Sequence, residues 1–110
     1  MIKSGTPITY DMNTNQIAKK TAEFFRTVPV EKAWLFGSYS RDEATEESDV
    51  DILVRYDDNA KISLLYISHL IGVLEKLLHR KVDLVEEGCL LPFAEETANR
   101  DKILIYERDN

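Results

Sequence analysis

Hydrophobic residues recur along most of the chain with the spacing of helices or of strands. Residues 13–28 open with two residue types that cap helices and then place hydrophobic side chains every three or four positions, which predicts a helix that ends before Pro29. Residues 61–79 repeat this spacing over a longer stretch and predict a second helix with one hydrophobic face. Gly72 lies in the middle of that stretch, where we expect it to allow close packing against a sheet.

Four shorter hydrophobic segments have the composition of strands. Residues 30–36 form a hydrophobic run between a proline and a glycine, and residues 50–54 alternate β-branched side chains with others. The two remaining segments are 82–85 and 103–106. Short helices are expected between the first two strands and between the last two. This alternation of helices and strands predicts an α/β fold, a sheet with helices packed on it.

Composition limits the class of protein. A chain of 110 residues is the size of one domain, which we assign to residues 13–110, preceded by a tail of residues 1–12. The net charge of -6 argues against direct binding of nucleic acid and against a polybasic membrane contact. The single cysteine, Cys89, excludes an internal disulfide and favours a reducing, cytoplasmic setting. We expect neither a membrane span nor a secretory signal.

Candidate chemistry begins with Gly37 and Ser38, at the end of the first predicted strand. A glycine lets the backbone approach a bound group closely, and Ser38 can cap the helical turn that follows and so direct backbone N–H groups at an anion. Arg41 lies one turn further on and can add a forked, charged contact to phosphate oxygens. A Gly-Ser pair is also common in ordinary tight turns, so these residues alone leave both interpretations open.

Two aspartates, Asp49 and Asp51, lie two positions apart at the second predicted strand, so their side chains share one face of it. Their mutual repulsion makes the pair an unfavourable choice for structure alone if that face is partly buried. Carboxylate oxygens suit Mg²⁺, which shares its coordination shell with substrate phosphates. The alternative interpretation is an edge strand with a solvated acidic face.

Asp83 is a charged residue inside the third predicted strand, where it needs a partner or a function. If this strand lies beside that of Asp49 and Asp51, the three carboxylates share a face and, with one or two Mg²⁺ ions, form a centre for phosphoryl or nucleotidyl transfer. Residues 42–58 contain eight acidic residues and one basic residue, which fits recruitment of cations. Alternatively, Asp83 is an ion-paired residue of an edge strand, and the acidic stretch is a solvated loop.

The combination is more specific than its parts. Residues 35–41 read Leu-Phe-Gly-Ser-Tyr-Ser-Arg, and residues 48–54 read Ser-Asp-Val-Asp-Ile-Leu-Val. With Asp83, these segments resemble the minimal, single-domain branch of the DNA polymerase β-like nucleotidyltransferase superfamily. The resemblance covers nearly the whole chain and implies a nucleotidyltransferase fold with a mixed four-stranded sheet.

The resemblance also implies roles for individual residues. In this family a Gly-Ser turn and a basic residue after it meet the phosphates of a nucleoside triphosphate, two strand aspartates hold Mg²⁺, and a third carboxylate helps bind the metal near the acceptor hydroxyl and draws its proton. ATP is the implied substrate, with two Mg²⁺ ions in the active complex. The implied nucleotide-binding residues are Gly37, Ser38 and Arg41, and the implied catalytic and metal-binding residues are Asp49, Asp51 and Asp83.

Minimal members of this family often pair with a HEPN-domain toxin and act as its antitoxin by placing AMP on it. The resemblance therefore implies transfer of AMP from ATP to a hydroxyl of such a partner protein. Asp42 departs from the pattern, because glycine often follows the arginine in this branch, and its negative charge can weaken phosphate binding.

Two alternatives remain open from the sequence. The chain can be a subunit that keeps the fold and neutralises its partner by binding only. It can be a drug-modifying transferase, acting alone or as a homodimer.

Among the aromatic residues, we expect Trp34, Phe24 and Phe25 in the core, and we expect Tyr39 to be exposed near the nucleotide, where it can touch the base or a partner.

Overall fold

The computed structural model describes residues 13–45 and 47–108, so the predicted tail of residues 1–12 lies outside the described residues. Strands and helices follow one another in the predicted order, with a single 3₁₀ turn, η1, after the first strand. The elements are α1 (Thr14–Phe25), β2 (Val30–Phe36), η1 (Gly37–Tyr39), β3 (Val50–Tyr56), α2 (Leu64–Leu78), β4 (Val82–Glu86), α3 (Pro92–Asp101) and β5 (Ile103–Glu107).

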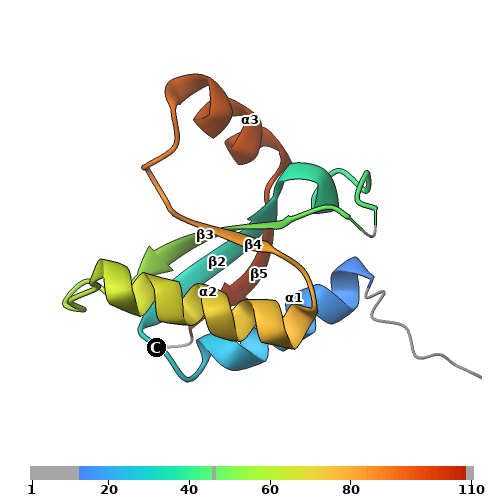
Figure 1. Cartoon of the computed structure of the whole chain (residues 1–110). Helices are drawn as coiled ribbons and strands as arrows, with labels where there is room; N and C mark the ends of the chain where they lie inside the picture. Colours follow the sequence, from blue (N-terminus) through green and yellow to red (C-terminus); the bar gives the residue numbers. More distant parts are fainter. Residues whose placement is uncertain (1–12, 46, 109–110) are drawn as a thin grey trace, which may run out of the picture.

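The four strands form one mixed sheet in the order β4-β3-β2-β5. β2 pairs antiparallel with both β3 and β5, whereas β3 and β4 are parallel. The parallel pair needs a crossover connection, and α2 provides it. The predicted α/β fold with a mixed four-stranded sheet is therefore confirmed, and Figure 1 shows the sheet between its helices.

Helices cover the two faces of the sheet unequally. α1 and α2 lie on one side and α3 lies on the other (Figure 1). The larger core fills the side of α1 and α2, and it includes Ile17, Leu74 and alternate residues of β3 such as Ile52. A smaller core of Trp34, Leu53 and Ala98 lies on the side of α3. The strand period of two thus gives β3 one fully covered face and one partly covered face.

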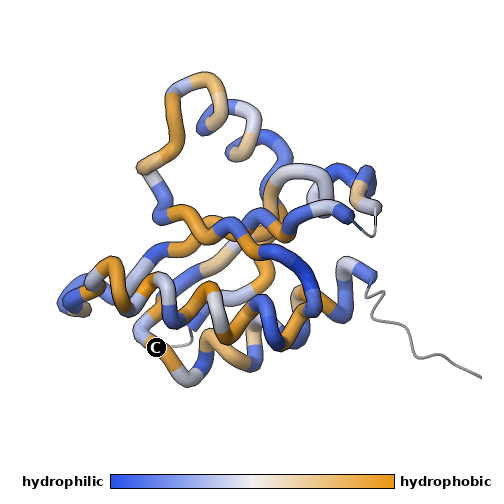
Figure 2. The backbone as a smooth tube through the Cα atoms, viewed as in Figure 1, coloured by the Kyte–Doolittle hydropathy of each residue, from blue (hydrophilic) through white to orange (hydrophobic). Residues whose placement is uncertain are grey.

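The helices begin where their capping residues predict. The Asn13 side chain accepts a hydrogen bond from the Gln16 backbone N–H, and the Gln16 side chain accepts one from the Asn13 backbone N–H, which completes a capping box. Ser63 caps α2, which ends at His79 in the left-handed conformation. Hydrophobic and hydrophilic positions alternate along α2 in Figure 2, as its predicted hydrophobic face requires.

Gly72 contradicts its predicted role. It lies on the exposed side of α2, and a Cβ atom at this position would meet nothing within 4 Å. The neighbouring Leu70 and Leu74 are fully buried and make the contact with the sheet instead. Of the described helices, none is long and hydrophobic enough to cross a membrane.

Candidate active site

The register of the sheet places the predicted aspartates together. Phe36 of β2 is paired with Asp51 of β3, and Asp51 is paired with Asp83 of β4. Paired residues of neighbouring strands point to the same face of a sheet. That face is the one of Leu53 and α3, because the residues on either side of Asp51 belong to the larger core on the other side. Asp49 immediately precedes β3 and is exposed.

Gly37 brings the turn after β2 against the Asp51 carboxylate. Its φ angle of +71° lies in the left-handed region, which favours glycine. A Cβ atom at this position would lie 2.1 Å from Asp51 Oδ2, so no larger residue fits without displacing the carboxylate. The bend and the acidic cluster are therefore parts of one site.

The electrostatics of Asp51 reflect this crowding. Burial, together with the negative charges of Asp83 and Asp49, raises the pKa of Asp51 from 3.8 to about 6, and the Arg41 guanidinium opposes the rise. Asp83, Asp49 and Arg41 are thus all close enough to Asp51 to influence its charge. A cation beside Asp51 would favour its charged form and so oppose the effects of burial and of the neighbouring carboxylates on its pKa.

The acidic cluster fits a cation that brings part of its own coordination shell. In the described residues, no group of three or more His, Cys, Asp or Glu side chains is arranged to hold a metal ion. Mg²⁺ does not require one, because it commonly takes one or two carboxylates and completes its shell with water and substrate phosphates. Asp51, with Asp49 and Asp83 near it and the Gly37 backbone against its carboxylate, has the chemistry of such a partial site.

The conformation of the turn differs from the predicted helix cap. Phe36, and not Ser38, occupies the position before η1, and no side chain caps the turn. The Ser38 carbonyl instead accepts hydrogen bonds from the backbone N–H groups of Arg41 and Glu43, and Ser40 Oγ donates to the Gly37 carbonyl. The turn is thus fixed by its own backbone and by Ser40, and the Ser38 hydroxyl is not used as a cap.

Arg41 is held at the edge of the site by two acidic residues that the sequence did not indicate. Its Nε lies 2.9 Å from Glu43 Oε1, and its Nη1 lies 3.8 Å from Asp101 Oδ2 at the end of α3. Glu43 is close in sequence and could have been foreseen, but Asp101 comes near only through the packing of α3. The side chain remains partly exposed, so an incoming phosphate can compete with both carboxylates.

Asp42 adopts a left-handed backbone conformation, with φ at +58°. Aspartate tolerates this region better than most residues, and glycine tolerates it best. Glycine would therefore suit this position, as the resemblance to the family implied. The Asp42 side chain is exposed, so its negative charge faces the solvent beside Arg41.

Tyr39 does not lie where the sequence predicted. It is only 5% exposed and belongs to the larger core, with Val50 and Leu78 among its members. The tight rotation of η1 after Gly37 carries this ring inward, away from the open face. Tyr39 therefore cannot contact a base or a partner, whereas the core positions predicted for Trp34 and Phe25 are confirmed.

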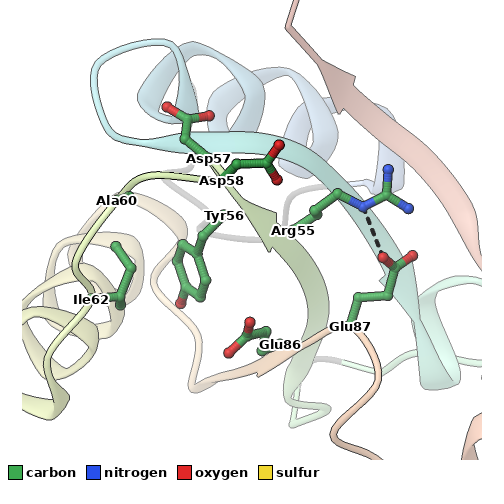
Figure 3. A pocket seen from close by; sticks show the side chains of 8 residues that line it. All are labelled: Arg55, Tyr56, Asp57, Asp58, Ala60, Ile62, Glu86 and Glu87. Carbon is green, nitrogen blue, oxygen red and sulfur yellow. Dashed lines mark hydrogen bonds and ion pairs between the residues drawn. The ribbon is translucent and has the colours of Figure 1, made fainter.

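A separate hollow lies at the end of β3 and β4 that is opposite to Asp51 and Asp83. It has a volume of about 400 Å³, and Figure 3 shows it lined by Arg55, Tyr56, Asp57, Asp58, Ala60, Ile62, Glu86 and Glu87. Arg55 Nε donates a hydrogen bond of 2.8 Å to Glu87, and burial together with the charge of Glu86 raises the pKa of Tyr56 to about 12. The carboxylates that line this hollow repel phosphates, so the hollow does not contribute to a nucleotide site.

Comparison with known proteins identifies the family. The sequence profile of the nucleotidyltransferase domain matches residues 15–108, nearly the whole described chain. The chain therefore belongs to the nucleotidyltransferase family, as its motifs implied.

Two sequence relatives make this more specific. A candidate protein adenylyltransferase of Methanocaldococcus jannaschii is 43% identical over 72 residues, which are 64% of this chain and 72% of that protein. The protein adenylyltransferase MntA of Thermococcus cleftensis is 41% identical over 76 residues, 69% of this chain and 75% of that protein. The chain is thus a minimal nucleotidyltransferase homologous to MntA.

Solved structures agree on the fold. A candidate minimal nucleotidyltransferase superposes with a TM-score of 0.68 and 30% identity over 84% of this chain and 95% of that one. A toxin–antitoxin complex with AMP-PNP superposes with a TM-score of 0.70 and 21% identity, over 84% of this chain and 74% of that one. An MNT antitoxin in complex with the tri-AMPylated HEPN toxin of Shewanella oneidensis superposes with a TM-score of 0.59 and 18% identity, over 84% of this chain and 73% of that one.

Proposed function

We propose that this chain is a Mg²⁺-dependent protein adenylyltransferase that moves AMP from ATP to a hydroxyl of a partner protein. The partner we propose is a HEPN-domain toxin, which the chain neutralises as its antitoxin. The observation that carries the proposal is the position of the Asp51 carboxylate, between the Gly37 backbone on one side and the paired Asp83 on the other.

Relatives support the choice of nucleotide and partner. MntA of T. cleftensis is a protein adenylyltransferase, and the two toxin–antitoxin structures contain an ATP analogue or an AMPylated HEPN toxin. Those activities belong to those proteins. Their fold is shared by this chain, and the proximity of Asp51 to the Gly37 turn and to Asp83 supports the same chemistry here.

Each residue of the site has a role in the proposed reaction. Gly37 and Ser38 receive the β- and γ-phosphates against the turn, and Arg41 exchanges its acidic partners for phosphate oxygens. Asp49 and Asp51 would hold Mg²⁺, which would neutralise phosphate charge and lower the pKa of the attacking hydroxyl.

The proposed chemical step is an in-line displacement. The partner's hydroxyl oxygen forms a bond to the α-phosphorus of ATP while the bond from that phosphorus to the bridging oxygen breaks and pyrophosphate leaves. The Asp83 carboxylate accepts the hydroxyl proton. Asp83 suits this task because it is exposed, and so can reach a group on another molecule.

Transfer of label tests the proposal. The chain is mixed with a HEPN-domain toxin, the proposed partner, with Mg²⁺ and with ATP labelled on the α-phosphate. We expect label on the partner with the natural chain and with Asp58→Asn, an exposed aspartate outside the site, and none with Asp49→Asn or Asp51→Asn. If the partner is neutralised without label, and both site variants neutralise it equally, the chain acts by binding alone and the proposal is wrong.

A further inference from the structure

We propose that the hydrophobic hollow between the Gly37 turn and α3 holds the base of the nucleotide, and that Phe93 stacks on it. The hollow has a volume of about 270 Å³. Its lining residues are Phe36, Gly37, Arg41, Phe93, Ala94, Thr97 and Ala98. This inference rests on the proposed function, because it names the subsite that the ATP base occupies.

Phe93 is unusual for a residue of a packed helix. Its side chain is 72% exposed, although it lies in the first turn of α3. The other half of the helix is anchored, because Ala98 is buried against Trp34 and Leu53. Figure 2 shows that the segment leading into α3 is hydrophobic although it lies at the edge of the molecule. An exposed aromatic ring beside a hollow is a suitable stacking surface for a flat base.

The hollow is continuous with the proposed phosphate site. Gly37 and Arg41 line it, and both also belong to the site where the phosphates are placed. Gly37 also lies against the Asp51 carboxylate. Only the ribose separates the base of a nucleotide from its α-phosphate, so one molecule can occupy both places.

Two other hollows among the described residues do not suit a base beside these phosphates. The one near Arg55 is lined by four carboxylates and lies at the far end of the strands. Another, of about 330 Å³, lies between α1 and β5 and is lined in part by Arg26, Glu107 and Arg108. The hollow beneath Phe93 combines a mainly hydrophobic lining with contact to the glycine turn.

The lining favours a purine. A two-ring base covers more of the Phe93 ring than a pyrimidine does, and stacking grows with the area covered. The small side chains of Ala94 and Ala98 leave room for the second ring. Thr97 Oγ1 donates a hydrogen bond to the Phe93 carbonyl, which leaves the hydroxyl oxygen as an acceptor for an amino group on the base.

Binding measurements with two ligands test the inference. The full chain is titrated in the presence of Mg²⁺ with a non-hydrolysable ATP analogue and, separately, with inorganic tripolyphosphate, which has no base. We expect Phe93→Ala to raise the Kd of the ATP analogue about tenfold, as loss of one stacking contact does, and to leave that of tripolyphosphate unchanged. Phe93→Tyr keeps a ring and should keep the affinity. Leu91→Ala removes another exposed hydrophobic side chain outside the hollow and serves as the matched control.

Each other result overturns the inference in a distinguishable way. If the natural chain binds both ligands and Phe93→Ala changes neither Kd, the hollow does not hold the base, although the proposed function stands. If Phe93→Ala weakens the binding of both ligands equally, the ring stabilises the Gly37 turn and does not stack on the base. If the natural chain binds neither ligand, the proposed function fails as well.

Discussion

The Asp51 carboxylate rests against the backbone of Gly37, with no space for a side chain between them. A Cβ atom at position 37 would lie 2.1 Å from Asp51 Oδ2. This contact joins two motifs that are separated in sequence into one site, and it requires glycine both for space and for its φ angle of +71°.

Replacing Gly37 with alanine should therefore damage both stability and binding. We expect a loss of roughly 1–3 kcal/mol for the left-handed conformation, a further loss from the clash, and no detectable binding of ATP. Gly88→Ala is a matched control, since Gly88 has a φ angle of +92° but open space around its Cβ position. Urea unfolding should show the smaller loss for Gly88→Ala, with nucleotide binding intact. Equal effects of the two substitutions would contradict the clash.

Asp51 should make the Mg²⁺-free protein less stable as the pH rises. Its pKa is raised from 3.8 to about 6 in the folded state, so the folded chain holds this proton more tightly than the unfolded chain does. Stability then falls as the pH increases through that range and stays lower above it. The difference corresponds to at most about 3 kcal/mol, and partial exposure to water makes the real value smaller.

Urea unfolding of the natural chain and of Asp51→Asn at several pH values measures this contribution. We expect the difference in unfolding free energy to favour Asp51→Asn above pH 6 without Mg²⁺ and to shrink or reverse when Mg²⁺ is added. Asp58→Asn should follow the natural chain throughout. A natural chain that is no less stable than Asp51→Asn at pH 7.5 without Mg²⁺ would contradict the crowding of the site.

Asp42 should limit the affinity for nucleotide. Its exposed charge lies beside Arg41, so Asp42→Asn and Asp42→Gly are both expected to lower the Kd for an ATP analogue, by about twofold to fivefold at low salt. Added salt should reduce the gain, because it screens exposed charges. Since glycine and asparagine both accept the φ angle of +58°, neither variant should lose stability. Unchanged affinity in both variants would show that this charge has no influence on the site.

Gly72→Ala should stabilise the protein by about 0.5–1 kcal/mol. The position is exposed in the middle of α2, and the added methyl group would contact nothing within 4 Å. Thermal unfolding followed by circular dichroism would measure the gain. A loss of stability would contradict the exposed, uncontacted position of Gly72.

The elements that the sequence predicted best are those with clear local boundaries. β2 begins after Pro29 and ends before Gly37, as its hydrophobic run indicated. α1 ends at Phe25, before the predicted end, because the chain turns there while Val28 still packs on the core. Hydrophobic spacing and nearby prolines and glycines therefore predict the ends of these elements to within about one turn of helix.

Parts of the site depend on non-local packing and could not be predicted in the same way. The motif spacing indicated the aspartates, but the pairing of Asp51 with Asp83 depended on strand order, which the sequence left as a condition. The inward ring of Tyr39, the approach of Asp101 to Arg41 and the hollow beneath Phe93 all follow from how η1 and α3 pack. No periodicity in the sequence reports these contacts.

Isothermal titration of the full chain with a non-hydrolysable ATP analogue tests most directly whether Gly37 and Asp51 form one nucleotide site. We predict binding that requires Mg²⁺, that disappears in both Asp51→Asn and Gly37→Ala, and that persists in Asp58→Asn and Gly88→Ala. Binding of equal strength by Asp51→Asn, or binding that does not depend on Mg²⁺, would contradict the account.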